Sequence, residues 1–337
     1  MRIVVAPDSF KGSLDARAVA EAIGEGWRSV RADDDLVLLP QADGGEGTLD
    51  AIAASVPGTT FRSAGQVTGP DGRPVAGEWL ELPDGTAVVE LARSSGIALM
   101  ERLDPIGATT RGMGETIAAA LDAGSTALII ALGGSASTDG GAGALDALAG
   151  YRPPAGGVRL LTDVTAPLLG PTGAAATFGP QKGATLSQIA ELEDRLTRFA
   201  ATFDADPASP GAGAAGGTAF GFLAAWQATI HPGAPEIGTL TGLDRQLGCA
   251  DVLMTGEGAF DQTSTQGKVV GHAFELAQRN STGVIAIAGR FTTEPPSLDG
   301  LLVASISLSV LAGSAEAAMA DPHHWLIEAG RKAAETV

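Results

Sequence analysis

The chain has 337 residues, which allows two domains of ordinary size, each with a hydrophobic core of its own. Its formal net charge of -18 argues against nucleic acid or an anionic membrane as a partner, because both need a basic face. A single cysteine, Cys249, excludes an intrachain disulfide and every metal site built on paired cysteines. There is no apolar run near the roughly 18 residues of a membrane span and no signal-peptide core before Asp8, so we expect a cytoplasmic protein.

The first 57 residues alternate between strand and helix patterns. Strands are predicted at "RIVVAP" and "DLVLLP", and helices over 14–30 and 47–55. From Phe61 the pattern changes to short alternating segments, such as "EWLEL" and "TAVVEL", which follow Pro-Asp-Gly turns. These features predict antiparallel hairpins.

The helical period returns after Thr109 in "GMGETIAAALDAG", and the strand-like "TALIIALGG" follows it. Apolar residues at 189, 192, 196, 199 and 203 predict a further helix, with Thr185 as its cap. From Asp251 the alternation resumes with "DVLMTG", a helix over 268–279, "GVIAIAG", "LLVASISL" and a terminal helix.

This order of elements predicts an α/β fold in which both chain ends build one domain. Parallel strands joined by right-handed crossovers can form a single Rossmann-like sheet from residues 1–60 and 241–337. Residues 61–240 are then expected to form a second, inserted α/β domain that contains the antiparallel hairpins.

Polar residues follow three predicted strands of the terminal domain, at the end where open parallel sheets bind their ligands. They are Asp8, Ser9, Lys11 and Ser13 after the first strand, Asp43, Gly44, Gly45 and Glu46 after the second, and Glu257, Asp261, Gln262, Thr263 and Lys268 after the third. Glycine N–H groups can approach an anion while a neighbouring carboxylate holds a hard cation such as magnesium. The clusters therefore predict a site for nucleotide phosphates.

The inserted region carries similar clusters at its predicted turns. They comprise Gly134, Ser135, Asp139 and Gly140 in "LGGSASTDGGAGA", Asp163 in "LLTDVTAPLLG", and Gln181 and Lys182 in "FGPQKGAT". Every cluster also has a purely structural alternative, because Asp and Ser commonly cap helices and glycine commonly occupies turns. A lysine between glycines can meet a phosphate or carboxylate, or it can be an ordinary surface residue.

Several common nucleotide-binding, metal-binding and nucleophile motifs are excluded, because their residues do not occur at the required spacing in this sequence. The P-loop pattern is absent, since Gly267-Lys268 is followed by valine, and no GxGxxG follows the first strand. The four histidines form no HExxH motif, and no GxSxG elbow is present.

Seven segments resemble the successive motifs of the bacterial class I glycerate kinases. In chain order they are "APDSFKGSL", "ADGGEGT", "GGSASTDGGAGA", "TDVTAPLLG", "FGPQKGA", "PGAGAAGG" and "TGEGAFDQTSTQGK". The resemblance implies ATP-dependent phosphorylation of D-glycerate to 2-phosphoglycerate, with Mg²⁺, on a two-domain α/β fold. The chain departs from the family in a shortened segment at "YRPPAGGVRLL", in Ser137-Thr138, and in "AGRFTTE", but no charged motif residue is lost.

Phosphoryl transfer requires a group that orients the attacking hydroxyl and cations on the phosphates. We expect Lys11 to meet a phosphate or the glycerate carboxylate, and Asp8, Asp43 and Asp261 to divide the work of orienting the hydroxyl and holding magnesium, with Asp43 and Asp261 as metal ligands. Glu257, Asp139 and Asp163 are second choices, and the other residues of the clusters are expected to bind substrate or nucleotide.

Three alternatives stay open at this point. They are a kinase that yields 3-phosphoglycerate, a non-catalytic protein that binds sugar acids or nucleotides, and an isomerase or dehydratase of hydroxy acids. The sequence leaves open the oligomeric state and which domain binds ATP.

Overall fold

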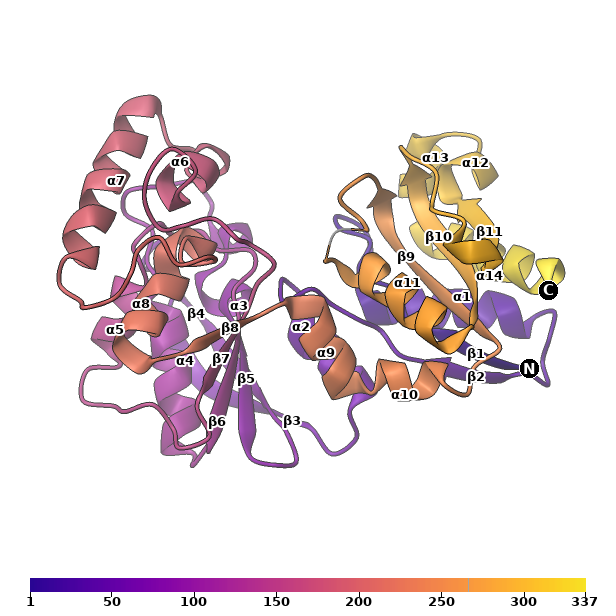
Figure 1. The fold of residues 1–337 in the computed structure, drawn as a ribbon, viewed down its shortest axis with the longest axis horizontal. Coiled ribbons are helices and arrows are strands. Elements are labelled where there is room, and N and C mark those ends of the chain that lie inside the picture. The colour runs from indigo at the N-terminus through magenta and orange to yellow at the C-terminus, as the bar shows by residue number, and fades with distance from the viewer. Residues whose placement is uncertain (266) are drawn as a thin grey trace. The chain divides into compact units, whose positions relative to one another are not determined.

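A computed structural model describes residues 1–265 and 267–337 (Figure 1). The chain forms two compact units. Unit 1 comprises Met1–Asp43, Asp50–Pro57 and Ala234–Val337, and unit 2 comprises Gly44–Leu49 and Gly58–Gly233. Both chain ends therefore belong to unit 1. The inserted folding domain over 61–240 stays a prediction.

Unit 1 contains a sheet of five parallel strands in the order β11-β10-β9-β1-β2. The strands are β1 (Arg2–Val5), β2 (Asp35–Leu38), β9 (Val252–Phe260), β10 (Gly283–Phe291) and β11 (Leu302–Ser307). The first strand pairs on one side with β2 and on the other with β9, about 250 residues later in the chain. The predicted parallel sheet built from both chain ends is thus confirmed.

The helices that pack on the two faces of this sheet are α1 (Ala16–Arg28), α10 (Leu243–Leu247), α11 (Val269–Asn280), α12 (Leu308–Leu311), α13 (Ala315–Ala320) and α14 (Pro322–Thr336). Most residues of α2 (Thr48–Ser55) and α9 (Gly233–Thr241) also belong to unit 1. Helix α1 begins later than the predicted residue 14, because the Asp15 side chain caps it by accepting a hydrogen bond from Ala18 N at 2.8 Å.

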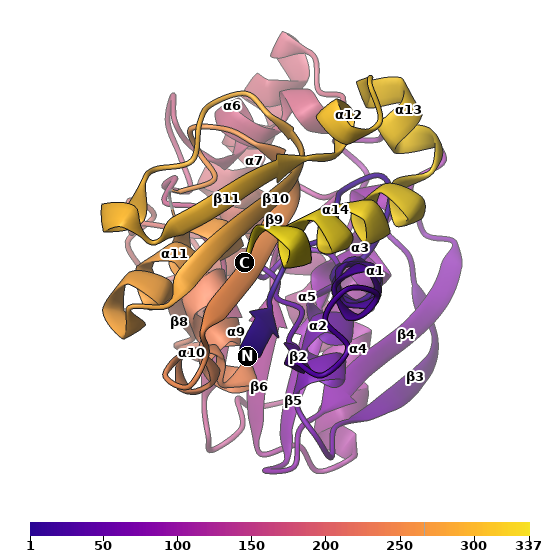
Figure 2. The ribbon, with the colours of Figure 1, turned by 90° about the vertical axis from the view of Figure 1, so that its right-hand side faces the viewer.

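Helices α1 and α14 lie side by side on one face of the sheet (Figure 2). Two glycines permit their close approach: a Cβ at Gly26 would stand 1.9 Å from Ile327 O, and one at Gly330 would stand 2.1 Å from Ile23 O. The opposite face carries α10 and α11, where Leu243 packs with the core. Unit 1 is therefore a three-layer α/β sandwich.

Unit 2 contains a six-stranded mixed sheet in the order β3-β4-β5-β6-β7-β8. The strands are β3 (Thr60–Thr68), β4 (Pro74–Glu81), β5 (Thr86–Glu90), β6 (Ala127–Ala131), β7 (Val158–Leu161) and β8 (Thr229–His231). The first three strands pair antiparallel, as the Pro-Asp-Gly turns predict, and β5 to β8 pair in parallel.

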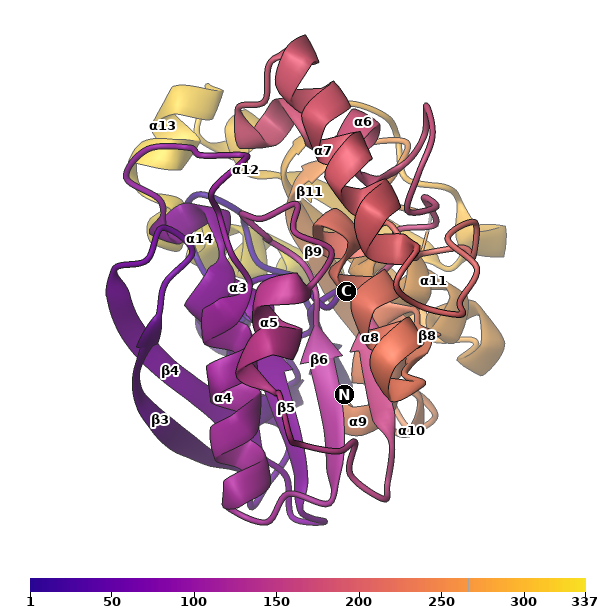
Figure 3. The same cartoon turned by 90° about the vertical axis from the view of Figure 1, so that its left-hand side faces the viewer.

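The helices of unit 2 are α3 (Leu91–Ser95), α4 (Arg111–Asp122), α5 (Ala142–Ala147), α6 (Ala174–Phe178), α7 (Leu186–Ala200) and α8 (Thr218–Trp226). Met113 and Ile117 of α4 and Phe222 of α8 pack in one core with the parallel strands, and Figure 3 shows α4 running along the sheet. Helix α7 starts after the predicted cap Thr185, which forms a capping box with Gln188. No described helix combines the length and the apolar character that a bilayer-spanning segment needs.

Candidate active site

The turn after β1 places a carboxylate and a lysine close together in the sequence and in the fold. The Asp8 N–H donates to Gly256 O at 2.9 Å, which fixes the chain beside β9. A tight turn follows, closed by a hydrogen bond from Ser13 N to Phe10 O at 2.8 Å, with Gly12 at φ +81°. Lys11 is at the exposed tip of this turn, while Asp8 is only 9% exposed.

The buried carboxyl of Asp8 has an unusual pKa. Burial, with the nearby carboxylates of Asp43 and Glu257, raises the pKa of Asp8 from its ordinary 3.8 to about 7, against the opposing effects of the Ser9 N–H and of Lys11. A carboxyl that titrates near neutral pH can exchange a proton with a substrate hydroxyl, as a general base must.

The motif after β9 brings a second carboxyl to the same place. Burial raises the pKa of Glu257, while Ser264 and Lys268 oppose that rise. Glu257 Oε1 is buried and accepts no hydrogen bond from the residues that the structure describes. The glycines of this motif serve close packing: a Cβ at Gly256 would stand 1.7 Å from Ile287 O in β10.

These residues border one cavity of about 400 Å³ within unit 1. Of the residues predicted from the sequence, it brings together Asp8, Ser9, Lys11, Ser13, Asp43, Glu257 and Lys268. Arg290 was not predicted, although its position near the end of β10 is a usable signal, and neither was an apolar wall. The wall consists of Leu308, Ala315, Ala318, Met319 and Pro322.

Three predicted residues lie in the loop beyond β9 and do not border this cavity: Asp261, Gln262 and Thr263. Thr263 donates to Asp261 Oδ1 from its N–H and its hydroxyl, each at 2.7 Å, and these bonds lower the pKa of Asp261. Lys268 Nζ donates to Thr263 Oγ1 at 2.8 Å. The loop is therefore linked to the cavity through Lys268.

The cavity offers carboxylate oxygens from Asp8, Asp43 and Glu257, the type of ligand that magnesium prefers. Among residues 1–265 and 267–337, no group of three His, Cys, Asp or Glu side chains could hold a metal ion by itself. Magnesium usually binds one or two carboxylates together with substrate phosphates and water. Among residues 1–265 and 267–337, no donor reaches the buried Glu257 Oε1, so this oxygen is available to a bound cation.

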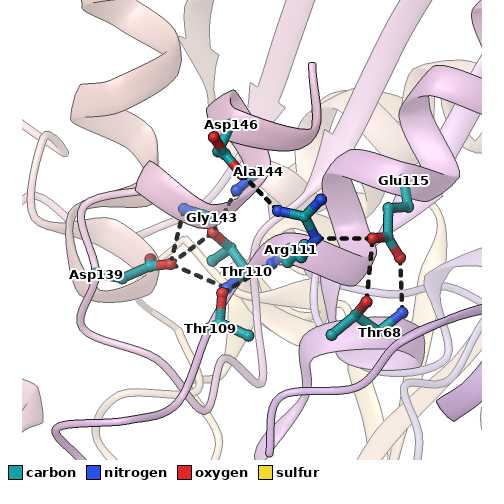
Figure 4. A network of polar contacts seen from close by, with 9 residues as sticks. All are labelled: Thr68, Thr109, Thr110, Arg111, Glu115, Asp139, Gly143, Ala144 and Asp146. Atoms are coloured by element: carbon teal, nitrogen blue, oxygen red, sulfur yellow. Dashed lines mark hydrogen bonds and ion pairs between the residues drawn. The ribbon is translucent and has the colours of Figure 1, made fainter. Parts of the chain in front are cut away.

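In unit 2, Asp139 is the centre of a hydrogen-bond network (Figure 4). Its Oδ2 accepts bonds from Thr110 N at 2.9 Å, Thr110 Oγ1 at 2.8 Å and Gly143 N at 3.2 Å, and its Oδ1 accepts one from Gly141 N at 3.0 Å. Beside it, Arg111 bridges Glu115 and Asp146. Asp139 thus fixes the turn before α5 to the start of α4, and Gly140, at φ +70°, belongs to the same turn.

The loop of Gly44, Gly45 and Glu46 is held in unit 2 by Glu90, a residue that was not predicted. Glu90, only 2% exposed, accepts hydrogen bonds from Gly47 N and Leu49 N, each at 3.1 Å. Its signal in the sequence is a carboxylate at the end of the apolar strand "TAVVE". Gly133 N donates to Gly44 O at 3.0 Å, whereas the Glu46 side chain is exposed.

A second cavity, of about 300 Å³, lies within unit 2. It brings together the predicted residues Gly134, Ser135, Gln181 and Lys182, and it does not include Gly44, Gly45, Glu46, Asp139, Gly140 or Asp163. Asp163 accepts a hydrogen bond from Gly233 N at 3.0 Å. The structure therefore brings some of the predicted residues to two cavities, one in each unit, and leaves the others outside both.

Comparisons with known proteins agree with one another. The model of a family described as the glycerate kinase family matches residues 3–156 and 151–337. The chain is 38% identical to glycerate 2-kinase of Escherichia coli K12, over 87% of this chain and 86% of that protein. It is also 38% identical to glycerate kinase of Bacillus subtilis 168, over 87% and 86%. A crystal structure described as "putative glycerate kinase 2" from Salmonella typhimurium LT2 matches with a TM-score of 0.83 and 34% identity, over 100% of this chain and 98% of that one.

Proposed function

This chain belongs to the glycerate kinase family, and on that premise we propose that it catalyses the ATP-dependent phosphorylation of D-glycerate to 2-phosphoglycerate and ADP. The observation that carries the proposal is the cavity of unit 1, in which the buried Asp8 carboxyl and the Lys11 ammonium border one space. Phosphoryl transfer requires a positioned base and cations on the phosphates.

Asp8 is the proposed base. Its pKa near 7 lets a large fraction of the carboxyl be ionised at neutral pH and still accept a proton from the attacking hydroxyl. The enzyme needs no covalent intermediate for this reaction, because orientation of the hydroxyl and stabilisation of charge supply most of the catalysis.

The remaining charges of the cavity suit a nucleotide. Lys11, Lys268 and Arg290 supply three cations for a polyphosphate, and the apolar wall around Met319 offers a surface for a purine ring, which glycerate does not need. We therefore place ATP in unit 1 within this proposal.

Magnesium, when bound, would neutralise negative charge on the phosphates. We propose Asp43 and Asp261 as the residues that hold it. Asp43 borders the cavity, and the low pKa of Asp261 keeps that carboxyl ionised at neutral pH. Glu257, whose Oε1 accepts no hydrogen bond from residues 1–265 and 267–337, is the next candidate.

In unit 2, the turn residues Gly134, Ser135, Gln181 and Lys182 are proposed to contact substrate, because they border the second cavity.

The single exposed thiol of Cys249 supports a cytoplasmic location, where thiols stay reduced.

The position of the new phosphate is tested by coupling the reaction to enolase without phosphoglycerate mutase. Only 2-phosphoglycerate can then become phosphoenolpyruvate, so we expect phosphoenolpyruvate to form at the rate of ADP. Appearance of phosphoenolpyruvate only after mutase is added would identify 3-phosphoglycerate as the product. Binding of D-glycerate and ATP without ADP formation would instead identify a non-catalytic binding protein.

A further inference from the structure

Lys182 is a buried cation in the wall of the second cavity. Its residue is only 3% exposed, at the end of the short 3₁₀ turn Pro180–Lys182 that joins α6 and α7. Its Nζ donates a hydrogen bond to the carbonyl oxygen of Ser137. The backbone of Gly216 lies so close to that oxygen that a Cβ there would stand 2.1 Å from it.

The ammonium has fewer partners than its chemistry requires. An ammonium has three N–H donors, and a buried cation is costly unless an anion compensates it. In the part of the chain that the structure describes, the Ser137 carbonyl is its one hydrogen-bond acceptor and no carboxylate forms an ion pair with it. Asp139 exerts an attraction from a distance, but its own oxygens accept bonds from Thr110, Gly141 and Gly143.

The space beside this ammonium suits a small, partly polar anion. The cavity of about 300 Å³ is bordered by Lys182, Ser135, Thr162 and Gln181, and by apolar side chains such as Phe178. A water molecule takes about 30 Å³ in the liquid, so the cavity has room for a three-carbon acid. Lys182 is the one cation among its described lining residues, which matches a group of low charge better than a triphosphate.

We propose that the cavity of unit 2 is a binding site for a small oxyanion, a carboxylate or a single phosphate group, held by the Lys182 ammonium. The choice of D-glycerate as a probe rests on the proposed function, whereas the site itself rests on the burial and the missing partners of Lys182. Burial lowers the pKa of Lys182 to about 8, with the attraction of Asp139 opposing it, so the side chain is still mostly charged at pH 7.

The chain contains four lysines, which makes a direct test practical. In protein labelled with ¹³Cε-lysine, nuclear magnetic resonance resolves four titrating signals, and Lys182→Arg identifies the one that belongs to Lys182. We expect saturating D-glycerate or inorganic phosphate to raise the pKa of Lys182 by at least one pH unit, with sodium chloride at equal ionic strength as the control. A pKa that neither probe changes would overturn the proposal.

Calorimetry without ATP gives an independent measurement. Lys182→Met is expected to weaken binding of the effective probe at least tenfold, whereas Lys332→Met, which removes an equal charge from an exposed position, is expected to leave it unchanged. Equal affinity in Lys182→Met and the parent protein would refute the site. If D-glycerate binds and depends on Lys182, the site accepts a carboxylate. If only phosphate binds and depends on Lys182, the site accepts a phosphoryl group. This measurement needs no turnover. If the protein binds D-glycerate or phosphate through Lys182 but has no kinase activity, the proposed function is contradicted and the binding site is supported.

Discussion

Replacing Asp8 with asparagine is expected to stabilise unit 1 above neutral pH while it removes catalysis. The ionised form of Asp8 is unfavourable in the folded protein, because the residue is buried and lies near the carboxylates of Asp43 and Glu257. Asparagine has nearly the same shape and carries no charge, so the variant avoids this cost. A gain of stability combined with a loss of activity distinguishes a functional carboxyl from a structural one.

The size of the effect follows from the pKa of Asp8. One pH unit corresponds to about 1.4 kcal/mol, so raising the pKa from 3.8 to about 7 destabilises the ionised form by about 4 kcal/mol. Below about pH 4 both the folded and the unfolded chain carry protonated Asp8, and the effect vanishes. Between about pH 4 and pH 7 the unfolded chain loses this proton and the folded chain keeps it, so the stability of the parent protein falls as the pH rises. Above pH 7 the difference from Asp8→Asn reaches its full size.

The measurement is urea denaturation of both proteins from pH 5 to pH 8.5, with EDTA present so that no metal binds the carboxylates. Hydrogen exchange of β1 and β9 reports on unit 1, since a chain of two units need not unfold in one step. Asp33→Asn, at an exposed position, controls for the loss of one negative charge. In the same variant series, ADP formation by Asp8→Asn is expected to fall at least about 100-fold. A stability difference that does not depend on pH, or an Asp8→Asn variant less stable than its parent at pH 8, would refute the reasoning.

Three further outcomes are expected. Lys11→Ala lowers turnover at least about 100-fold, or about 2.7 kcal/mol, with an unchanged circular dichroism spectrum; a folded variant of near-normal rate would make Lys11 an ordinary surface residue. Chelation of divalent cations stops ADP formation and added magnesium restores it, whereas activity that survives chelation contradicts the metal role of Asp43 and Asp261. Asp139→Ala lowers the free energy of unfolding by about 3 kcal/mol in urea denaturation, because its hydrogen-bond donors lose a charged acceptor; an unchanged midpoint argues against that structural role.

The parallel sheet of unit 1 and many residues of its cavity could be predicted from the sequence. Apolar runs identify the strands, and the rule that parallel sheets bind ligands at the carboxyl ends of their strands identifies the cavity residues. Apolar runs mark β1 and β9, and the carboxyl ends of neighbouring parallel strands lie at one edge of the sheet. Asp8, Glu257 and Lys268 are therefore near one another whatever the details of the loops.

Other parts of the site depend on contacts that no local pattern records. Asp139 was predicted to bind a ligand, yet its partner Thr110 lies 29 residues earlier in the chain, so its role in holding a turn is visible only in the fold. Lys182 was predicted to bind substrate or nucleotide, with an ordinary surface lysine as the alternative, and its burial by the turn before α7 is visible only in the fold. The apolar wall around Met319 comes from short helices whose sequence has no feature that points to a ligand.

The close packing of α1 against α14 has a consequence for the order in which the chain is synthesised. Strand β1 pairs with β9, about 250 residues later, and α1 packs closely on α14, about 300 residues later. Almost all of unit 2, by contrast, is one continuous segment that is synthesised before residue 234. We expect unit 2 to become compact during translation, while β1 lacks β9 and α1 lacks α14 until those later segments are made. In a nascent chain, the early exposure of apolar β1 and α1 therefore makes the N-terminal segment the part most dependent on chaperones.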